Sequence, residues 1–253
     1  MVKNLVSVII PYYKNRFFFK ECIDSVYSQS YKKKEVFIIY DNEKKDDLNY
    51  IKKIISKKKN IKIIINKKNL GAGISRNKGI NRSNGEFIAF IDSDDIWVKD
   101  KLKKQVSFMR SNNIDLSYTS YEIIDEKNRS IGLRKCQKNT SYENLLYDCN
   151  IGLSTVIIRK NTQTKNLVSF PKIKTKEDYV LWLKLSKAKI KFMGMENTLT
   201  KWRKTNNSLS SGTYQKFVDG FRVYFIYQQF NFIKSVFYLT ILSLNFLKKS
   251  ILN

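Results

Sequence analysis

Short apolar runs alternate with amphipathic stretches along the first half of the chain. Runs that are apolar almost without a break are typical of strands buried on both faces of a sheet, whereas apolar residues spaced three and four apart are typical of helices. The predicted strands cover residues 5–10, 35–40, 61–65 and 86–91, and the predicted helices cover residues 17–29, 48–56, 74–82 and 99–110. This alternation predicts an α/β fold, with a Rossmann-like, mostly parallel central sheet and helices on both faces.

The second half of the chain has a more mixed pattern. The expected elements are a strand or hairpin at residues 115–125, a strand at 155–160, a helix at 177–188 and two closing strands at 189–193 and 198–204. No internal repeat and no linker rich in Pro, Gly or Ser interrupts the chain up to residue 213. We therefore interpret residues 1–213 as one domain.

The C-terminal tail, residues 214–253, is dense in aromatic side chains, Leu and Ile, with several lysines among them. Its longest uncharged run, Ser235–Leu247, has 13 residues, fewer than the roughly 20 that a membrane-spanning helix needs. We expect two amphipathic helices that lie on a membrane surface with their lysines against anionic headgroups. The alternative is that these helices pack on the domain as ordinary core.

The chain is strongly basic, with 48 Lys and Arg against 22 Asp and Glu in 253 residues and a formal net charge of +26. Such a charge favours polyanionic partners: nucleotides, nucleic acid, acidic glycans or anionic lipids. An AT-rich coding bias also accounts for part of the lysine excess. The three cysteines fit neither a disulfide framework nor a zinc site, and the N-terminal residues lack the features of a signal peptide. We therefore expect reduced thiols in a cytoplasmic protein.

Histidine is absent from the sequence. This excludes a Ser-His-Asp triad, a cysteine activated by histidine and any metal held by imidazole. Acid–base chemistry is then left to Asp, Glu, Lys, Tyr or Cys. A bound metal would be a hard ion held by oxygen atoms, such as Mg²⁺ or Mn²⁺.

Three carboxylates, Asp92, Asp94 and Asp95, directly follow the fourth predicted strand. Like charges packed at the end of a buried strand repel one another, so a cation among them is expected. Mg²⁺ and Mn²⁺ take few carboxylates together with phosphate oxygens, which makes a nucleotide diphosphate the natural third party. The alternative is that these acids cap the next helix, which would explain one or two of them but not three.

Two other strands end in polar residues, at 11–13 and at 41–42, and all three clusters would share the carboxyl edge of the sheet, where such folds bind ligands. The P-loop pattern is missing, and the glycines at 71–73 make a poor dinucleotide fingerprint. Their expected role is to open the helix that carries Arg76, which could reach a phosphate. Glu177 and Asp178 precede a later helix and are interpreted either as a helix cap or as a general base.

Six segments, in order and at matching spacing over about residues 5–210, resemble family 2 glycosyltransferases with the GT-A fold, of the bacterial surface-polysaccharide type. They are VSVIIPYYKN, VFIIYDN, GAGISRNKGI, GEFIAFIDSDDIW, EDYVLWLKL and KWRKTNNSLS. The resemblance implies an inverting, metal-dependent enzyme that moves a sugar from a nucleotide-diphosphate donor, typically a UDP-sugar, to a hydroxyl of a glycan acceptor. Lipopolysaccharide, O-antigen or capsule synthesis is the implied setting, and the basic, amphipathic tail favours a lipid-linked acceptor.

The resemblance also implies roles for individual residues. Pro11 and Tyr13 would line the nucleotide pocket, and Asp41 would contact the base. Arg76 would face the nucleotide. Asp92, Ser93 and Asp94 match the DxD motif, with Asp92 near the ribose and the metal and Asp94 on the Mn²⁺ or Mg²⁺.

Two further positions carry implied roles from later in the chain. Asp178 matches the catalytic base, and Arg203, in the loop after the last strand, would help to hold the leaving diphosphate.

The sequence departs from the family pattern at three places. Tyr40-Asp41-Asn42-Glu43 stands where two acids followed by Gly-Ser are usual, which leaves the ribose contacts open. Thr205 stands near the place of a histidine that often joins the metal site. The QxxRW motif of processive synthases is missing, which favours the addition of one or a few sugars.

Three alternatives remain at this stage. A nucleotidyltransferase would carry a glycine-rich basic loop after the first strand, and PYYKNR has no glycine. A basic nucleic-acid-binding module leaves Asp92, Asp94 and Asp178 without a purpose, so no nucleic-acid partner is expected. A catalytically dead relative would bind but not react. The expected location is cytoplasmic, peripheral at the inner face of the cell membrane, with an anionic membrane surface as partner.

Overall fold

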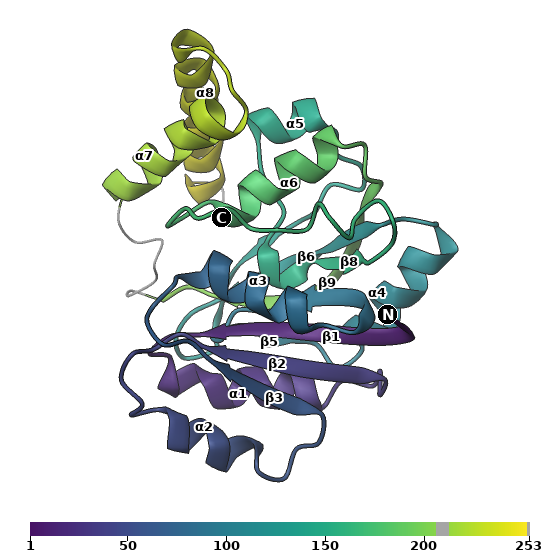
Figure 1. Ribbon diagram of the computed structural model, residues 1–253. Coiled ribbons are helices and arrows are strands. Elements are labelled where there is room, and N and C mark those ends of the chain that lie inside the picture. The colour runs from purple at the N-terminus through teal and green to yellow at the C-terminus, as the bar shows by residue number, and fades with distance from the viewer. Residues whose placement is uncertain (206–212, 252–253) are drawn as a thin grey trace.

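The computed structural model of the protein describes residues 1–205 and 213–251, and its layered α/β architecture is shown in Figure 1. In this part of the chain nine strands form one sheet in the order β3-β2-β1-β4-β8-β6-β9-β5, with β7 paired to β6. The strands are β1 (Val2–Tyr12), β2 (Lys34–Tyr40), β3 (Ile61–Ile65), β4 (Gly85–Phe90), β5 (Ile96–Trp97), β6 (Leu116–Ile124), β7 (Ser130–Arg134), β8 (Ile157–Arg159) and β9 (Phe192–Arg203). Strands β3, β2, β1 and β4 are parallel, which confirms the prediction for the first half of the chain.

Strand β1 begins at Val2, three residues earlier than the apolar pattern predicts. Asn4 adopts a left-handed φ of 66°, and the pairing of β1 with β4 shifts between Val2 and Val6. Asparagine tolerates this conformation better than most residues, and its N–H donates to Glu86 Oε2 over 2.7 Å. The polar residue that looks like a strand boundary is therefore an irregularity inside the strand.

Beyond β4 the sheet becomes mixed, because β8 runs antiparallel to β4 and β6 whereas β6 runs parallel to β9. The prediction of two closing strands is wrong, since residues 192–193 of the first segment and residues 198–203 of the second belong to the single strand β9. Exposed Glu196 and Asn197 interrupt the apolar pattern, and the pairing with β6 shifts register at Ser120 to accommodate them. The segment predicted as a strand or hairpin is β6, which forms a hairpin with β7.

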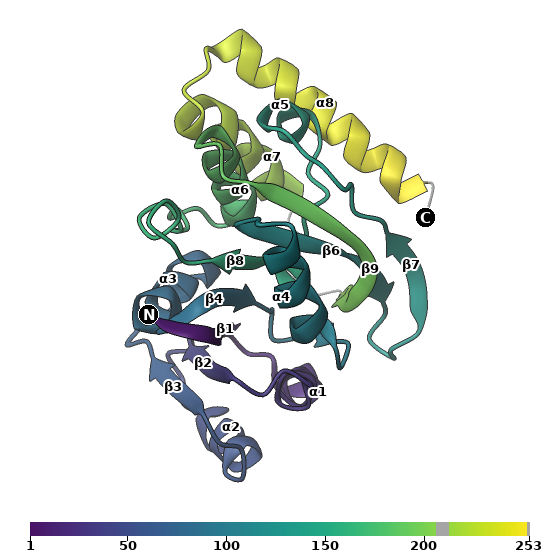
Figure 2. The same cartoon turned by 90° about the vertical axis from the view of Figure 1, so that its right-hand side faces the viewer.

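Helices cover both faces of the sheet, as predicted (Figures 1 and 2). Side chains alternate along each strand, so Val8 points into one core and Ile9 into the other. The core around Val8 includes residues of α1 (Arg16–Tyr27), α2 (Leu48–Ile55) and α4 (Lys101–Ser111), and the core around Ile9 includes residues of α3 (Ala72–Arg82), α5 (Tyr142–Tyr147) and α6 (Glu177–Lys187). The two-faced burial explains why these strands are apolar almost throughout.

The C-terminal tail forms α7 (Thr213–Arg222), a one-turn π-helix, η2 (Val223–Tyr227), and α8 (Phe232–Ile251), beside α5 and α6 (Figure 2). Val223, Tyr224 and Leu242 are buried in the same core as α6, so one side of the tail packs on the domain. No helix in the described residues is long and apolar enough to cross a membrane. The predicted division at residue 213 adjoins residues 206–212, which lie outside the described part, and it stays a prediction.

Candidate active site

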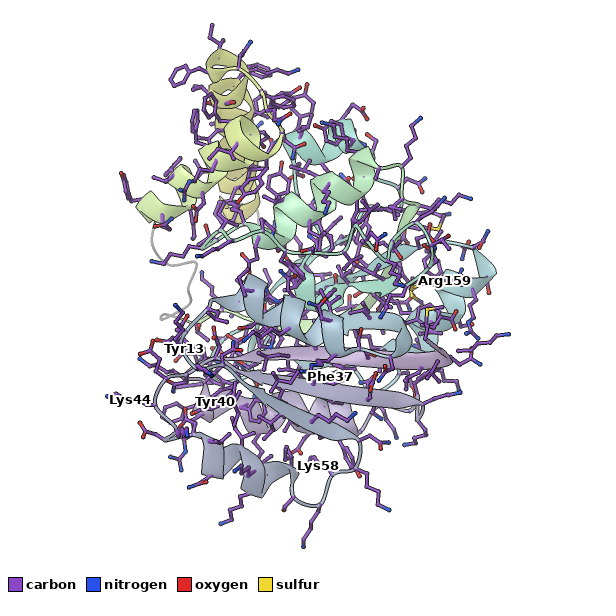
Figure 3. All side chains as sticks on the ribbon, in the orientation of Figure 1. Tyr13, Phe37, Tyr40, Lys44, Lys58 and Arg159 are labelled. Carbon is purple, nitrogen blue, oxygen red and sulfur yellow. The ribbon has the colours of Figure 1, made fainter. Side chains whose placement is uncertain are left out.

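The three polar strand ends meet at one edge of the sheet. In the parallel register Tyr12 of β1 lies opposite Tyr40 of β2, and the N–H of Asp41 donates to the carbonyl of Tyr12 over 2.8 Å. On the other side of β1, the N–H of Ile91 donates to the carbonyl of Ile9. Figure 3 shows Tyr13 and Tyr40 at this same end of the sheet. The predicted gathering of residues 11–13, 41 and 92–95 at the carboxyl edge is confirmed.

The acidic segment after β4 is a hydrogen-bonded turn that leads into β5. The N–H of Asp92 donates to Ser154 Oγ over 3.0 Å, and the N–H of Asp95 donates to the carbonyl of Asp92 over 3.1 Å. Ser93 is buried, and its hydroxyl accepts a hydrogen bond from Asn15 Nδ2 over 3.0 Å. Because β5 and Asp100, the residue before α4, separate these acids from the helix, the helix-cap alternative is wrong for them.

Burial and the proximity of like charges raise the pKa of two carboxyl groups in this turn, Asp94 and Asp95. Burial, followed by the negative charge of Asp92, raises the pKa of Asp94 to about 7. Burial and then Asp94 raise the pKa of Asp95 well above its ordinary value. Asp94 forms no ion pair with any residue of the described chain. A cation beside Asp94 would relieve this repulsion, so the turn fits a divalent ion, although the described residues contain no group of three or more acidic, Cys or His side chains that could hold one by themselves.

Arg76 of α3 connects the acidic turn to the start of α6. Its Nη2 lies 2.6 Å from Asp92 Oδ1 and its Nη1 lies 2.7 Å from Glu177 Oε1. The guanidinium is only 4% exposed. Burial alone would lower the pKa of Arg76, but Asp92 and Glu177 raise it above the ordinary value. Arg76 thus contacts Asp92 of the acidic turn and Glu177 of α6, and its contact with a nucleotide stays a prediction.

Asp178 is the second residue of α6, and it lies next to Glu177. Its Oδ1 accepts a hydrogen bond from the N–H of Tyr179 over 2.7 Å. Burial, followed by the charge of Glu177, raises the pKa of Asp178 to about 6. The cap position belongs to Lys176, so the side-chain cap interpretation of these two acids is wrong, although the helix dipole still favours negative charge in the first turn.

Lys176 adopts a left-handed φ of 67°, a conformation that is unfavourable for lysine. Strained backbone of this kind is found where a structure holds a functional side chain in place. The sequence contains the pair Glu177-Asp178, but it gives no separate signal for the contact of Glu177 with Arg76.

Asp41 is buried at the end of β2 and organises the loop that precedes α3. Its Oδ1 accepts hydrogen bonds from Asn66 Nδ2 and from the N–H of Leu70, and its Oδ2 accepts one from the N–H of Gly71, all over 2.8 Å. A carboxylate has about four acceptor positions, so one position on Oδ2 is left for a ligand. Contact of Asp41 with a nucleotide base stays a prediction.

Pro11 and Tyr13 flank the buried Tyr12 at the end of β1. Pro11 is half-buried opposite Ile39, whereas Tyr13 is 37% exposed, with the ammonium of Lys14 5.0 Å from the centre of its ring. An exposed aromatic ring at the carboxyl edge is suited to stacking with a base. The role of both residues in lining a nucleotide pocket stays a prediction.

Arg203 differs from the prediction in its position. It is the last residue of β9, not part of the following loop, and its side chain is completely buried. Its Nη2 lies 2.7 Å from Glu21 Oε2, its Nε donates to the carbonyl of Asp94 over 2.9 Å, and its own N–H donates to Asp95 Oδ1 over 2.9 Å. Arg203 thus fixes the acidic turn from behind, and contact with a diphosphate stays a prediction.

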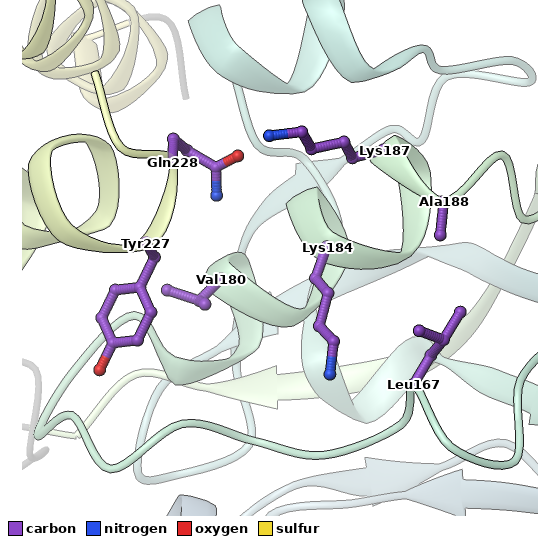
Figure 4. Close-up of a pocket in the computed structure, with 7 residues that line it drawn as sticks. All are labelled: Leu167, Val180, Lys184, Lys187, Ala188, Tyr227 and Gln228. Carbon is purple, nitrogen blue, oxygen red and sulfur yellow. The ribbon is translucent and has the colours of Figure 1, made fainter. Parts of the chain in front are cut away.

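The last segment of the resemblance, KWRKTNNSLS, falls partly on residues 206–210, which lie outside the described residues. Thr205 is the last described position before them. A separate pocket of about 350 Å³ lies on the outer side of α6, and Figure 4 shows its lining. It is lined by Leu167, Val180, Lys184, Lys187, Ala188, Tyr227 and Gln228, and it includes none of the predicted site residues.

The fold is of the GT-A class, which is found in glycosyltransferases. The fold resembles that of TarS from S. aureus, solved as residues 1–349 with UDP-GlcNAc, with a TM-score of 0.73 and 23% identity over 88% of this chain and 65% of that one. It also resembles the mannosyltransferase PcManGT of Pyrobaculum calidifontis, solved with GDP-Man and Mn²⁺, with a TM-score of 0.68 and 14% identity over 89% of this chain and 64% of that one.

The family is shown by sequence comparison. The model of glycosyl transferase family 2 matches residues 7–171, and the chain belongs to this family. It is 31% identical, over 98% of both chains, to TuaG of Bacillus subtilis, which is named as a teichuronic acid biosynthesis glycosyltransferase. It is 35% identical to WfgD of Escherichia coli, over 84% of this chain and 82% of that one. WfgD is named as a UDP-Glc:α-D-GlcNAc-diphosphoundecaprenol β-1,3-glucosyltransferase.

Proposed function

We propose that this family 2 glycosyltransferase is a metal-dependent, inverting enzyme that transfers a sugar from a UDP-sugar to a hydroxyl of a lipid-linked glycan. The observation that carries the proposal is the contact chain Asp92–Arg76–Glu177, with Asp178 beside Glu177. It links the acidic turn on the donor side to a carboxylate suited to act as a base. Glycosyl transfer needs these two functions at one site.

Asp94 and Asp92 are the residues that would hold Mn²⁺ or Mg²⁺. The raised pKa of Asp94, at about 7, reflects burial and repulsion by Asp92 that a cation would relieve. When bound, such an ion supplies charge that stabilises the departing diphosphate. The remaining ligands would come from the donor phosphates and water, as is usual for these ions.

Asp178 acts as the general base in this proposal. With a pKa of about 6, it is mostly ionised at neutral pH and still basic enough to accept a proton. The acceptor oxygen attacks the anomeric carbon of the sugar on the face opposite the diphosphate, the bond to the diphosphate breaks, and the hydroxyl proton passes to Asp178. A single displacement of this kind inverts the configuration.

The donor nucleotide would lie at the carboxyl edge of the sheet. Tyr13 and Pro11 offer an apolar wall, and the remaining acceptor position of Asp41 suits an N–H of the base. Ser93 keeps the acidic turn in place through Asn15. A strongly basic chain also favours a substrate with two phosphates.

The acceptor is inferred from the relatives. WfgD is named for transfer to a diphosphoundecaprenol-linked sugar, and TuaG for teichuronic acid synthesis. We place the reaction of this protein in the cytoplasm, at the inner face of the cell membrane, within the synthesis of a surface polysaccharide such as an O-antigen or a capsule. Family membership removes the nucleotidyltransferase and nucleic-acid-binding alternatives.

Calorimetric titration of UDP with and without Mn²⁺, together with diphosphate release from a panel of nucleotide sugars, tests the proposal. We expect metal-dependent binding of UDP that Asp94→Asn weakens at least tenfold, because Asp94 is the proposed metal ligand that has no ion-pair partner in the described chain, whereas Asp92 is paired with Arg76. Asp178→Asn is the matched control: it should keep metal-dependent UDP binding but lower kcat by about 10²–10⁴. Equal binding with and without the metal, or no turnover of any donor, would contradict the proposal.

A further inference from the structure

Helix α8 is apolar on two opposite sides. Its inner side packs on the domain through buried residues, among them Ser235 and Leu242. Its outer side carries a second stripe at spacings of four and three residues, formed by Ile233, Phe237, Thr240, Leu244 and Leu247. Ile233 is 80% exposed, and the other apolar members are about half exposed. A helix that is apolar on both sides is typical of one with partners on both sides, and the described chain covers only one.

Helix α7 and the π-helix extend this stripe into one surface. Tyr214 is 82% exposed, and Phe217, Phe225 and Ile226 are each about half exposed. The ring of Phe221 lies 5.3 Å from that of Phe225 and 5.7 Å from that of Phe232, measured between centroids, so the aromatic residues run without a break from α7 to the start of α8. We call this the apolar tail surface; it comprises Tyr214, Phe217, Phe221, Phe225, Ile226, Phe232, Ile233, Phe237, Leu244 and Leu247.

Within the tail segment itself, the exposed charges have one sign. Between residues 214 and 248 the only acidic residue is Asp219, whose side chain is completely buried. Asp219 Oδ2 accepts hydrogen bonds from the N–H and the hydroxyl of Thr175, both over 3.0 Å. The cations of this segment are Lys216, Lys234, Lys248 and Arg222, whose Nη1 lies 3.5 Å from Asp219 Oδ1. The described tail therefore offers solvent apolar rings and positive charge, with no exposed carboxylate.

The combination of apolar side chains and positive charge distinguishes between two possible partners of the apolar tail surface. A second copy of the chain would bring another net charge of +26 against the same basic surface, which opposes close approach. An anionic bilayer accepts apolar side chains below its headgroups and attracts lysine and arginine at the headgroup level. Interfacial helices have the same make-up of bulky apolar residues on one side and flanking basic residues.

We propose that the apolar tail surface docks on an anionic lipid bilayer, with α7 and α8 lying in its interface and neither helix spanning it. The biological purpose of this docking rests on the proposed function. An enzyme that acts on a lipid-linked acceptor meets that acceptor at a membrane surface. The inner side of the tail stays packed on α5 and α6.

Co-sedimentation of the full chain with vesicles tests the docking. We expect binding to vesicles containing phosphatidylglycerol, weaker binding to pure phosphatidylcholine, and loss of binding at high salt, because screening removes the contribution of the basic residues. The variant Ile233→Ser/Phe237→Ser/Leu244→Ser should bind at least tenfold more weakly, since three apolar side chains no longer enter the lipid. Its melting temperature should stay close to that of the parent, because at least half of each of these side chains is exposed.

The variant Ile131→Ser/Leu133→Ser is the matched control, since both residues are exposed apolar side chains on β7, outside the tail. It should bind vesicles as the parent does. Undiminished vesicle binding by the triple variant would overturn the proposal, as would a parent chain that elutes as a dimer dissociated by the same triple substitution. Diphosphate release in solution, measured on all variants, separates the two inferences, because it depends on the active site and not on docking.

Discussion

At the residue scale, the site depends on which of its buried carboxylates form an ion pair and which do not. Arg76 holds Asp92 with one nitrogen and Glu177 with the other, while Asp94 and Asp178 lie next to these acids without a basic ion-pair partner in the described chain. The paired acids are neutralised and the two beside them have a raised pKa. Burial and like charge thus divide these four carboxylates into two that are paired with Arg76 and two that have a raised pKa, a pattern that is typical of functional sites.

The pH dependence of kcat/KM tests this division. The acid limb of the profile should lie near pH 6, because Asp178 must lose its proton to act as a base and its pKa is about 6. Glu177→Gln removes the neighbouring negative charge, so the pKa of Asp178 should fall and the limb should move to lower pH. Glu143→Gln, at an exposed acid of α5, is the control and should leave the limb in place. A limb that stays near pH 6 in Glu177→Gln would rule out this coupling.

At the element scale, strand β9 positions the acidic turn. Its last residue, Arg203, bonds to Asp94 and Asp95 from behind and reaches Glu21 of α1, with the guanidinium 4.4 Å from the centre of the Phe18 ring. Elements from both ends of the chain therefore fix one short turn. A rigid support of this kind keeps two repelling acids close together at little cost to the turn itself.

Replacing Arg203 tests whether its side chain stabilises the acidic turn. Arg203→Met should lower the free energy of unfolding by about 2 kcal/mol, because the buried carbonyl of Asp94 and the interaction with Glu21 lose their partner. Arg129→Met is the matched control: its ion pair with Asp125 is mostly exposed, with 72% of the arginine side chain accessible, so the change should be within about 1 kcal/mol. Urea unfolding measures both, and similar losses in the two variants would contradict a special role for Arg203.

Sequence reasoning succeeds where a single local pattern decides the structure. The parallel strands β1, β2 and β4 follow directly from apolar runs that are buried on both sides. It fails for β5, a two-residue strand that exists only because it pairs with β9, and for the continuity of β9 itself, which depends on register shifts against β6.

The same limit applies to the site. The acids at the strand ends are visible in the sequence, whereas the contact of Arg76 with Glu177 joins residues 101 positions apart and depends on the packing of α3 against the start of α6. The burial of Arg203 likewise arises from tertiary packing that no local pattern contains.

At the scale of the whole molecule, the absence of histidine makes the carboxyl groups with a raised pKa important for the pH dependence of stability. Between pH 6 and 8 no unperturbed side chain of this protein titrates, whereas Asp94 and Asp178 have pKa values of about 7 and about 6. Both are raised from an ordinary value of 3.8, so the folded chain binds protons more tightly than the unfolded chain. Their favourable contribution is therefore lost as the pH rises through 6 and 7.

The urea midpoint measured in EDTA should consequently be higher at pH 6 than at pH 8. Asp94→Asn should reduce this difference, because it removes the group with the pKa of about 7. Adding Mn²⁺ at pH 8 should raise the midpoint of the parent, since binding to the folded state stabilises it. A midpoint that is the same at both pH values, or higher at pH 8, would show that these acids do not control the stability.

The hydrogen bonds of Asp219 to Thr175 have a consequence for substrate choice. Asp219 belongs to α7, and Thr175 lies three residues before Asp178, the base of the proposed mechanism. If α7 rests on lipid, the distance between the membrane plane and the carboxylate of Asp178 is fixed. This distance then limits which acceptor sugars can reach Asp178. Acceptors whose reactive sugar sits at that distance from the anchor would be selected, and a glycan lengthened by several units would carry its new end out of reach.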